Sequence, residues 1–341
     1  MSLRNPVGDN AIWFFAFGYF ACYAPYSGLT KVVSGGMLDG VAPVAGPTLL
    51  PVATASSLVV MLVFLTAVKW WGYATQAQVG SLSLPVPTKW TALSGVCTAA
   101  ILTTTTLAYT FEGVSILFVM LLMRGGVLIL APVVDAMTGR KSRWFTWIGL
   151  LCAFAALIVA FAEDGGYAIS VACAIDIAIY LLAYLIRLRF MSKLAKSHDP
   201  DVMRRYFVEE QLLSVPLTLV LLGVAALIGS GEFLGQIRAG FTTHLASGAV
   251  LATIAIGVLS QGTGIFGTLI YLDKRENTFS VPVNRSSSIL AGVVASFGLA
   301  AIFGTKLPSA WQLGAAGLVI GAIVVLSFGA VIDTRRRAAA P

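Results

Sequence analysis

Two arginines stand in the middle of long apolar stretches of this sequence. Arg124 lies in EGVSILFVMLLMRGGVLILAPVVD, which runs from 112 to 135, and Arg285 lies in a similar stretch 161 residues later. A charged side chain at membrane depth costs about 2.5–3.5 kcal/mol on the insertion scale, so it normally faces a partner or a wet cavity. A guanidinium offers a planar fork of donors that matches phosphate and carboxylate groups. The pair therefore predicts an anion-binding site, with an internal ion pair for each arginine as the alternative.

Four further polar residues in apolar surroundings are candidates for the same site. Asp176 is the only acid that falls well inside a predicted membrane span, where carboxylates serve as proton relays or as counter-charges. Asn284 adjoins Arg285 and Gln261 lies in SQGTGIFG, and both are predicted to contact a ligand because an amide in hydrocarbon needs hydrogen-bond partners. Tyr180 follows Asp176 by one helical turn and is predicted to line the cavity, with a place in the core as the alternative.

Patterns for other kinds of chemistry are absent from the sequence. His198 and His244 fall in predicted loops, and no HExxH, GxSxG or phosphate-binding Gly-rich motif occurs. The four cysteines occur singly in apolar runs, so neither a metal site nor a disulfide framework is indicated. The net charge of +7 is spread over loops rather than interleaved with aromatics, which argues against nucleic acid as a partner. We expect no enzyme activity, no metal and no cofactor.

Composition places the chain among polytopic membrane proteins. Its 341 residues are 58% hydrophobic and only 11% charged, whereas soluble domains carry about 25% charged residues. A membrane-spanning helix needs about 20 predominantly apolar residues. Ten segments meet this requirement, so an all-α fold with ten transmembrane helices is predicted at 11–33, 47–71, 89–111, 114–136, 144–162, 167–186, 206–229, 245–271, 278–303 and 309–332.

The distribution of lysine and arginine predicts the topology of these ten segments. Cytoplasmic loops retain positive charge. If the N-terminus is cytoplasmic, seventeen lysines and arginines fall in inside loops and only three, Lys31, Arg238 and Lys306, fall outside. Both termini are therefore predicted to be cytoplasmic, in a membrane of the bacterial inner-membrane type.

The two halves of the sequence predict an inverted repeat. A shift of 161 residues places Asp273 on Glu112 and Arg285 on Arg124, so an acid followed twelve residues later by an arginine occurs twice. Residues 1–165 and 166–341 would each hold five helices, and an odd number of helices gives the halves opposite orientations in one membrane domain. Transporters built this way bind their substrates near the midplane, between the repeats.

The two segments that close the halves carry a family resemblance. WFTWIGLLCAFAALIVAF (144–161) and WQLGAAGLVIGAIVVLSF (311–328) share a leading tryptophan and many small residues. With ten helices in two inverted halves, the whole chain resembles the drug/metabolite transporter superfamily, which includes EamA-type exporters, nucleotide-sugar transporters and triose-phosphate translocators. The glutamate that often precedes the closing helices of EamA proteins is absent here. The position of Asn284 and Arg285 resembles that of basic residues in phosphate-handling members.

These observations predict a secondary transporter that moves a small anionic organic metabolite, phosphorylated or carboxylated, by alternating access. Arg124 and Arg285 would hold the anion, Asn284 and Gln261 would orient it, and Asp176 would couple transport to protons or neutralise an arginine; exchange is an alternative mode. Membrane lipid is an expected partner, and a homodimer is compatible with the sequence. The alternatives are a flippase for a lipid-linked or amphipathic head group, an exporter of neutral metabolites or amino acids, and a non-transporting membrane subunit.

Two local interactions are also predicted. Glu209 and Glu210 are expected to pair with Arg204 and Arg205 at the membrane surface, where an ion pair is worth less than about 1 kcal/mol. The threonine run at 103–106 is expected to be structural, because a threonine hydroxyl in a helix can bond to the carbonyl one turn back.

Overall fold

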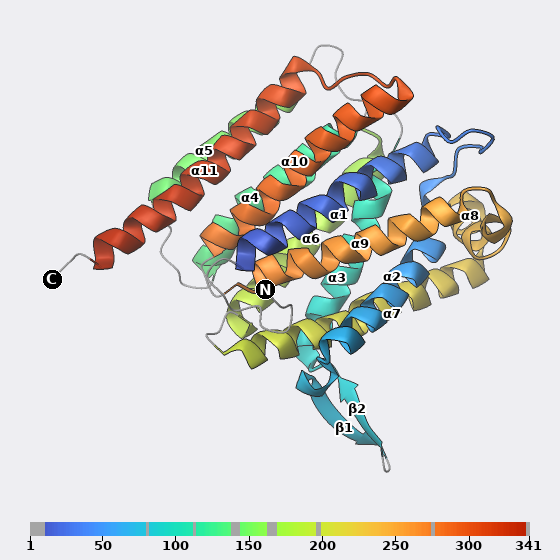
Figure 1. Ribbon diagram of the computed structural model, residues 1–341, viewed down its shortest axis with the longest axis horizontal. Helices are drawn as coiled ribbons and strands as arrows, with labels where there is room; N and C mark the ends of the chain where they lie inside the picture. The colour runs from blue at the N-terminus through green and yellow to red at the C-terminus, as the bar shows by residue number, and fades with distance from the viewer. Residues whose placement is uncertain are drawn as a thin grey trace.

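The computed structural model describes residues 11–79, 82–111, 114–137, 144–161, 169–195, 199–273 and 277–338. These ranges form a bundle of long helices with one small β-hairpin (Figure 1). The helices are α1 (Ala11–Ser34), α2 (Gly46–Val68), α3 (Lys89–Ala108), α4 (Ile116–Met137), α5 (Trp144–Phe161), α6 (Val171–Leu194), α7 (Pro200–Ile228), α8 (Gly231–Phe241), α9 (Val250–Tyr271), α10 (Asn277–Phe303) and α11 (Ala310–Ala338). A helix therefore occupies each of the ten apolar segments identified in the sequence, and the short α8 is additional.

The composition of the helices makes the chain an integral membrane protein. Within the described residues, six helices are long and apolar enough to cross a membrane: α2, α3, α6, α7, α9 and the Ser280–Phe303 part of α10. Large apolar side chains also point outward from many helices, among them Leu151, Leu182 and Leu227, which is 82% exposed. A soluble monomer rarely exposes so many large apolar groups together, whereas lipid solvates them.

Helix ends follow local sequence signals. Ser170 precedes α6 and its hydroxyl accepts a hydrogen bond from the backbone N–H of Cys173 at 3.1 Å. Pro200 opens α7, where its missing N–H is not needed, and the Asp199 carboxylate caps the same turn. Gly229 ends α7 with a φ of +54°, a left-handed conformation that glycine adopts without a steric cost.

The helices pack in a regular set of pairs. The two helices α5 and α11 lie side by side at one edge of the bundle (Figure 1). Towards the centre, α1 packs against α9 and α10, while α6 packs against α3 and α4. Close approach depends on small residues: a Cβ at Gly257 of α9 would meet the carbonyl oxygen of Ala53 in α2 at 2.1 Å. The hydroxyl of Ser57 donates to the Gly257 carbonyl at 2.8 Å across the same contact.

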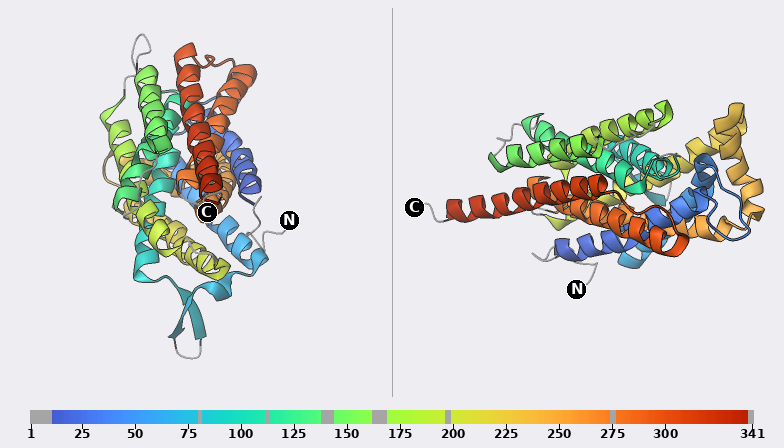
Figure 2. Two further views of the ribbon diagram at one scale, coloured as in Figure 1. Left: turned by 90° about the vertical axis from the view of Figure 1, so that its left-hand side faces the viewer. Right: turned by 90° about the horizontal axis from the view of Figure 1, so that it is seen from above.

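Both ends of the described chain lie at one end of the bundle, and α8 lies at the other (Figure 2, right). The helix α8 covers α2 and α7, with its buried Ile237 against Leu50 and Leu222. The hairpin, β1 (Thr75–Val79) and β2 (Leu82–Val86), connects α2 to α3 and projects from the bundle (Figure 2, left).

Three features differ from the sequence prediction. The hairpin makes the fold mostly rather than entirely α-helical, because the connection TQAQV…LSLPV pairs as two antiparallel strands. The eleven-residue α8 was not predicted, since it is too short and too polar for a membrane span. Finally, α6 continues to Leu194 instead of ending near 186, and α7 begins at Pro200 instead of 206. Arg187, which looked like a loop residue, is therefore inside α6 and only 3% exposed.

Candidate functional site

The two arginines predicted from the sequence lie together in the centre of the bundle. Arg124 of α4 is 2% exposed and Arg285 of α10 is fully buried. Arg124 donates one guanidinium hydrogen bond to the hydroxyl of Tyr180 in α6 and another to the hydroxyl of Tyr23 in α1. Arg285 donates to the same Tyr180 hydroxyl at 3.0 Å. One phenol oxygen thus accepts from two cations that come from different helices.

Aromatic rings surround both guanidinium groups. The Arg124 guanidinium lies 5.1 Å from the ring centre of Tyr23 and 5.3 Å from that of Tyr180. The Arg285 guanidinium lies 4.7 Å from the ring centre of Tyr184 and 5.5 Å from that of Tyr271. A desolvated cation–π contact is worth about 2 kcal/mol, so these rings offset part of the cost of burial. We call the two arginines with these four tyrosines the tyrosine–arginine cluster.

No carboxylate among the residues that the structure describes neutralises this cluster. Neither arginine forms an ion pair with another described residue, and the Nε of Arg124, the Nε of Arg285 and one Nη of Arg285 have no hydrogen-bond acceptor. Two unit charges that share one hydrogen-bond acceptor repel by about 3 kcal/mol at an effective dielectric constant of about 20. The predicted alternative, in which an internal ion pair holds each arginine, is thus not the arrangement of this conformation. The cluster combines an excess of positive charge with unused donors, which is the chemistry that binds an anion.

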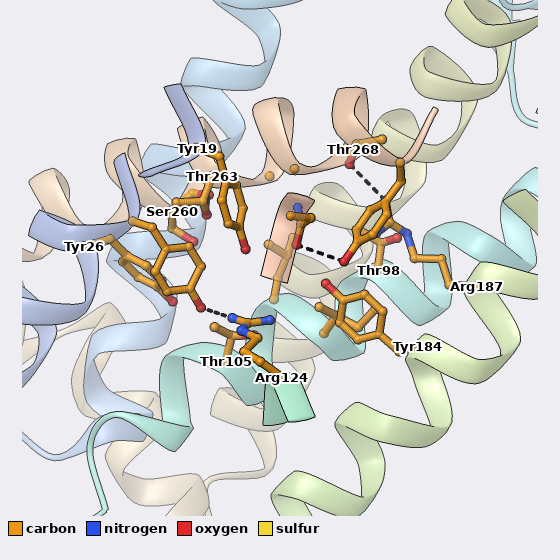
Figure 3. A pocket seen from close by; sticks show the side chains of 17 residues that line it. Tyr19, Tyr26, Thr98, Thr105, Arg124, Tyr184, Arg187, Ser260, Thr263 and Thr268 are labelled. Atoms are coloured by element: carbon orange, nitrogen blue, oxygen red, sulfur yellow. Dashed lines mark hydrogen bonds between the residues drawn. The ribbon is translucent and has the colours of Figure 1, made fainter. Parts of the chain in front are cut away.

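A cavity adjoins the cluster and is lined by residues of α1, α3, α4, α6, α9 and α10 (Figure 3). About 50 Å³ of it is open to the centres of water-sized molecules. A single water needs roughly 10–15 Å³ on this measure, so the cavity holds a few waters and is too small for an organic metabolite. Arg124 lines the cavity directly, whereas Tyr180 and Arg285 lie behind its wall. The lining is rich in hydroxyl groups, among them those of Tyr19, Tyr23, Tyr26, Thr98, Ser260 and Thr263.

The two predicted amides occupy different places. Asn284 lines the cavity; its side-chain oxygen accepts a hydrogen bond from the Tyr271 hydroxyl at 2.9 Å, and its nitrogen has no acceptor. Gln261 lies outside the cavity, where its nitrogen donates to the oxygen of Gln211 at 3.0 Å and joins α9 to α7. Asn284 is therefore positioned to donate to a ligand, while Gln261 is engaged in a contact between helices.

Asp176 is buried in α6, one turn before Tyr180, and is 6% exposed. One of its carboxylate oxygens has no hydrogen-bond partner, and it forms no ion pair with Arg124 or Arg285. It does not line the cavity. Its predicted role as proton relay or counter-charge stays a prediction.

The predicted pairing of the two glutamates in α7 is half wrong. Glu209 does pair with Arg205, at 2.9 Å, but Glu209 is fully buried rather than at the surface. Glu210 pairs instead with Arg187, whose Nε and Nη contact the two carboxylate oxygens at 2.9 and 2.6 Å. The reason is that α6 continues past residue 186 and carries Arg187 into the bundle, where the Glu210 carboxylate compensates its buried charge.

The threonine run behaves largely as predicted. Thr103, Thr104 and Thr106 each donate their hydroxyl hydrogen to the carbonyl four residues earlier. Thr106 is also hydrogen-bonded to the hydroxyl of Tyr26 at 2.8 Å. Thr105 lines the cavity. Most of the run therefore satisfies its own helix, and Thr105 alone faces the site.

Sequence reasoning missed the tyrosines of α1, although a signal for them exists. Tyr19, Tyr23 and Tyr26 are spaced by four and three residues, which places them on one helical face. The 161-residue shift also places Tyr19 on Tyr180 and Tyr23 on Tyr184. The geometry matches: the rings of Tyr19 and Tyr23 are 5.1 Å apart at 47°, and those of Tyr180 and Tyr184 are 4.7 Å apart at 54°. Arg124 lies over Tyr23 as Arg285 lies over Tyr184.

A metal site is not found in the described part of the chain, which contains no group of three or more His, Cys, Asp or Glu side chains that could hold an ion.

Comparison with known proteins identifies the fold and no family. No family model and no curated protein matches the sequence. Sixteen chains of solved structures do match the structure. One of them, described as "Crystal structure of protein", superposes with a TM-score of 0.54 at 14% sequence identity, over 95% of this chain and 98% of its own. The likeness shows that 95% of this chain follows a fold already seen in another protein.

Proposed function

We propose that this protein is a secondary transporter of a small anionic organic metabolite, phosphorylated or carboxylated, and that Arg124 and Arg285 bind the anionic group. The observation that carries the proposal is the sharing of the Tyr180 hydroxyl by two buried guanidinium groups that have no carboxylate partner in the described part of the chain. An anion between them would supply the missing charge and accept the unused donors. Asn284 would orient the substrate through its free amide nitrogen, and the contact predicted for Gln261 would require α7 and α9 to separate.

An inverted repeat supports transport by alternating access. Suppose that α1, α2, α3, α4 and α5 correspond in this order to α6, α7, α9, α10 and α11. Exchanging each helix for its counterpart then turns one observed contact into another: α1–α9 becomes α6–α3, α1–α10 becomes α6–α4, and α2–α9 becomes α7–α3. Three contacts, α4–α10, α5–α11 and α2–α7, map onto themselves, as contacts on a two-fold axis must. The ring geometry of Tyr19–Tyr23 and Tyr180–Tyr184 follows the same exchange. These regularities favour two five-helix halves, 1–165 and 166–341, that rock about a central site.

The small cavity fits an intermediate of such a cycle. A few waters fit beside Arg124, whereas a metabolite does not. Substrate entry would therefore require the halves to move apart, and Tyr180 would have to release at least one arginine to the incoming anion. The anion would then contact the cluster differently before and after opening, and only a differential contact of this kind lets a ligand shift a conformational equilibrium.

The proposal has three further parts: the protein belongs to the drug/metabolite transporter superfamily, it lies in a bacterial-type inner membrane, and both of its termini are cytoplasmic. The described ends of the chain lie at the same end of the bundle (Figure 2), as an even number of crossings requires. Of the seventeen lysines and arginines predicted to lie inside, Arg187 is buried in α6, and the remaining sixteen against three outside favour the cytoplasm for that end.

The test is thermal stabilisation of the detergent-purified protein against phosphorylated sugars, nucleotides, organic acids, amino acids and lipid head groups. A ligand that binds the folded state raises the melting temperature by mass action. We expect one class of anions to do so in the wild type and in Arg189→Gln, which changes an exposed arginine of α6. Arg124→Gln and Arg285→Gln should abolish the shift. A flat response to all anions, or an unchanged shift in both cluster variants, would refute the proposal.

A further inference from the structure

Arg187 is a second buried arginine that lines the cavity with Arg124, and it differs from Arg124 and Arg285 in having a carboxylate partner. Arg187 of α6 and Glu210 of α7 form a two-point ion pair, with Nε–Oε1 at 2.9 Å and Nη–Oε2 at 2.6 Å, and the pair is 4% and 0% exposed. Arg187 also donates to the Thr268 hydroxyl at 2.9 Å. In Figure 3, Arg187 lies beside Thr268 on one side of the cavity, and Arg124 lies nearer Tyr26 on another.

The surroundings of Glu210 suit either protonation state. The Ser94 hydroxyl donates to Glu210 Oε1 at 2.5 Å and is itself hydrogen-bonded to the Tyr206 hydroxyl at 2.6 Å. A hydroxyl is both donor and acceptor. The hydroxyl groups of Ser94 and Tyr206 can therefore donate a hydrogen bond towards a carboxylate or, after rotation, accept one from a carboxylic acid. Among the described residues, three charged or titratable groups surround Glu210: Arg187 of α6, Cys97 of α3 and Tyr206 of α7. The other described elements packed against α7 place none there. The strand β2 and the helix α2 contain no titratable residue, Tyr73 lies against Arg204, and Glu232 and Arg238 of α8 lie at the far end of α7.

Glu209, the neighbouring carboxylate, cannot play the same part. It accepts hydrogen bonds from both ends of the hairpin connection and from Arg205, and it does not line the cavity. Asp176 does not line the cavity either. Among these acids, only Glu210 is directly bonded to a cation that faces the cavity.

We propose that Arg187 is a second anion subsite and that substrate binding moves one proton onto Glu210. The substrate class is a small dianion with a negative group at each end. One end binds Arg124 and Arg285, and the other end binds Arg187 and replaces Glu210 as its partner. Glu210 would then be a buried carboxylate without its cation, which is costly enough that it takes up a proton from cavity water instead. Charge and atoms balance, because the dianion and one proton enter while the bond between Arg187 and Glu210 is replaced by a bond between Arg187 and the substrate. Transport would be a symport of the dianion with a proton.

This inference rests on the proposed function, and its experiment separates the two. The probes are inorganic sulfate and a series of alkane-α,ω-disulfonates, which stay ionised between about pH 6 and about pH 8 and so neither take up nor release protons themselves. Binding is followed by thermal shift, and proton uptake by an indicator dye in weakly buffered detergent solution. We expect a disulfonate of matching length to bind with uptake of one proton, and its affinity to rise by up to tenfold for each pH unit lowered. Sulfate should bind without proton uptake.

The variants assign the proton. Glu210→Gln should still bind the disulfonate, with no proton uptake and a flat pH dependence, whereas Glu232→Gln, at an exposed position of α8, should behave as the wild type. Disulfonate binding without proton uptake in the wild type overturns the inference whether or not Glu210→Gln folds. Loss of uptake in Asp176→Asn, with uptake retained in Glu210→Gln, also overturns it and assigns the proton to Asp176. If neither anion binds the wild type, the proposed function itself fails.

Discussion

Arg187 and Arg285 are both buried arginines that belong to the central site, yet their environments are opposite. Arg187 holds a carboxylate at two points and a threonine hydroxyl. Arg285 has one phenol hydroxyl, two aromatic rings and two nitrogens without an acceptor. A compensated charge stabilises the ligand-free fold and meets an anion only by leaving its carboxylate, whereas a charge that the fold leaves uncompensated can bind an anion directly. The same substitution at the two sites should therefore have opposite effects.

The largest expected effect comes from Arg187→Gln compared with Arg285→Gln. Arg187→Gln leaves Glu210 buried without its cation and should destabilise the protein by about 3–5 kcal/mol. Arg285→Gln removes one of two repelling charges and should leave the ligand-free protein as stable as the wild type, or more stable by up to about 3 kcal/mol. Melting temperatures of the purified proteins without added anion measure both. Equal destabilisation by the two substitutions would remove the distinction.

Glu209→Ala tests a second compensated charge. The Glu209 carboxylate accepts from the backbone N–H and hydroxyl of Thr75, the backbone N–H of Thr88 and the hydroxyl of Thr91. Removing an acceptor shared by four donors should cost about 2–4 kcal/mol and loosen the hairpin. Arg205→Ala is the matched control: its side chain is 51% exposed, so loss of this ion pair should cost less than about 1 kcal/mol. Limited proteolysis of the hairpin and thermal unfolding should both separate the two variants.

Tyr180→Phe sharpens the account of the tyrosine–arginine cluster. The variant keeps the ring and removes the hydroxyl that accepts from both arginines. The ligand-free protein should lose about 1–3 kcal/mol, because two buried donors lose their acceptor. A bound anion restores an acceptor, so the thermal shift produced by the anion should be larger than in the wild type. Tyr73→Phe, which removes a phenol hydroxyl that accepts from Arg204 away from the cavity, should leave the shift unchanged.

The smallest effect concerns His244, in the connection between α8 and α9. Its two ring nitrogens are hydrogen-bonded to Thr253 at 2.9 Å and Ser247 at 3.0 Å, and burial lowers its pKa below the usual value. The folded state thus disfavours the protonated ring. Its contribution to stability is complete above the unfolded pKa of about 6.5 and is lost as the pH falls through the lowered folded pKa. In thermal melts over this range, His244→Gln should lose stability less steeply towards acid than the wild type; parallel pH profiles would contradict this.

The helices were predictable from composition. In a membrane the backbone polar groups must be satisfied by hydrogen bonds within the helix, and the side chains that face lipid must be apolar, so each helix appears in the sequence as a long apolar run. The end of α6 was not predictable. Arg187, Arg189 and Lys193 look like a cytoplasmic loop, and the carboxylate that admits Arg187 to the interior lies 23 residues away in another helix. The hairpin carries an alternating pattern that places Ala77, Leu84 and Val86 on one face, but its position depends on the distant Glu209.

For the site, the sequence located both arginines and the neighbouring Asn284, because charged and amide side chains stand out in apolar runs. Tyr19 and Tyr23 could have been found as well, since the 161-residue shift aligns them with Tyr180 and Tyr184. The hydrogen-bond and ion-pair partners of these side chains could not be predicted. Whether a buried arginine pairs with a glutamate, a phenol or nothing depends on packing between helices far apart in sequence, and so does the placement of Gln261 against Gln211.

The central claim is that the fold leaves Arg124 and Arg285 uncompensated so that they can bind an anion. Anomalous diffraction from crystals grown with selenate, an analogue of sulfate and phosphate, tests it most directly. The account predicts a selenium peak within hydrogen-bond distance of both guanidinium groups, with the Tyr180 hydroxyl displaced from at least one, and no such peak in crystals of Arg285→Gln. Selenium peaks confined to surface residues such as Arg205, with the cluster unchanged, would contradict it.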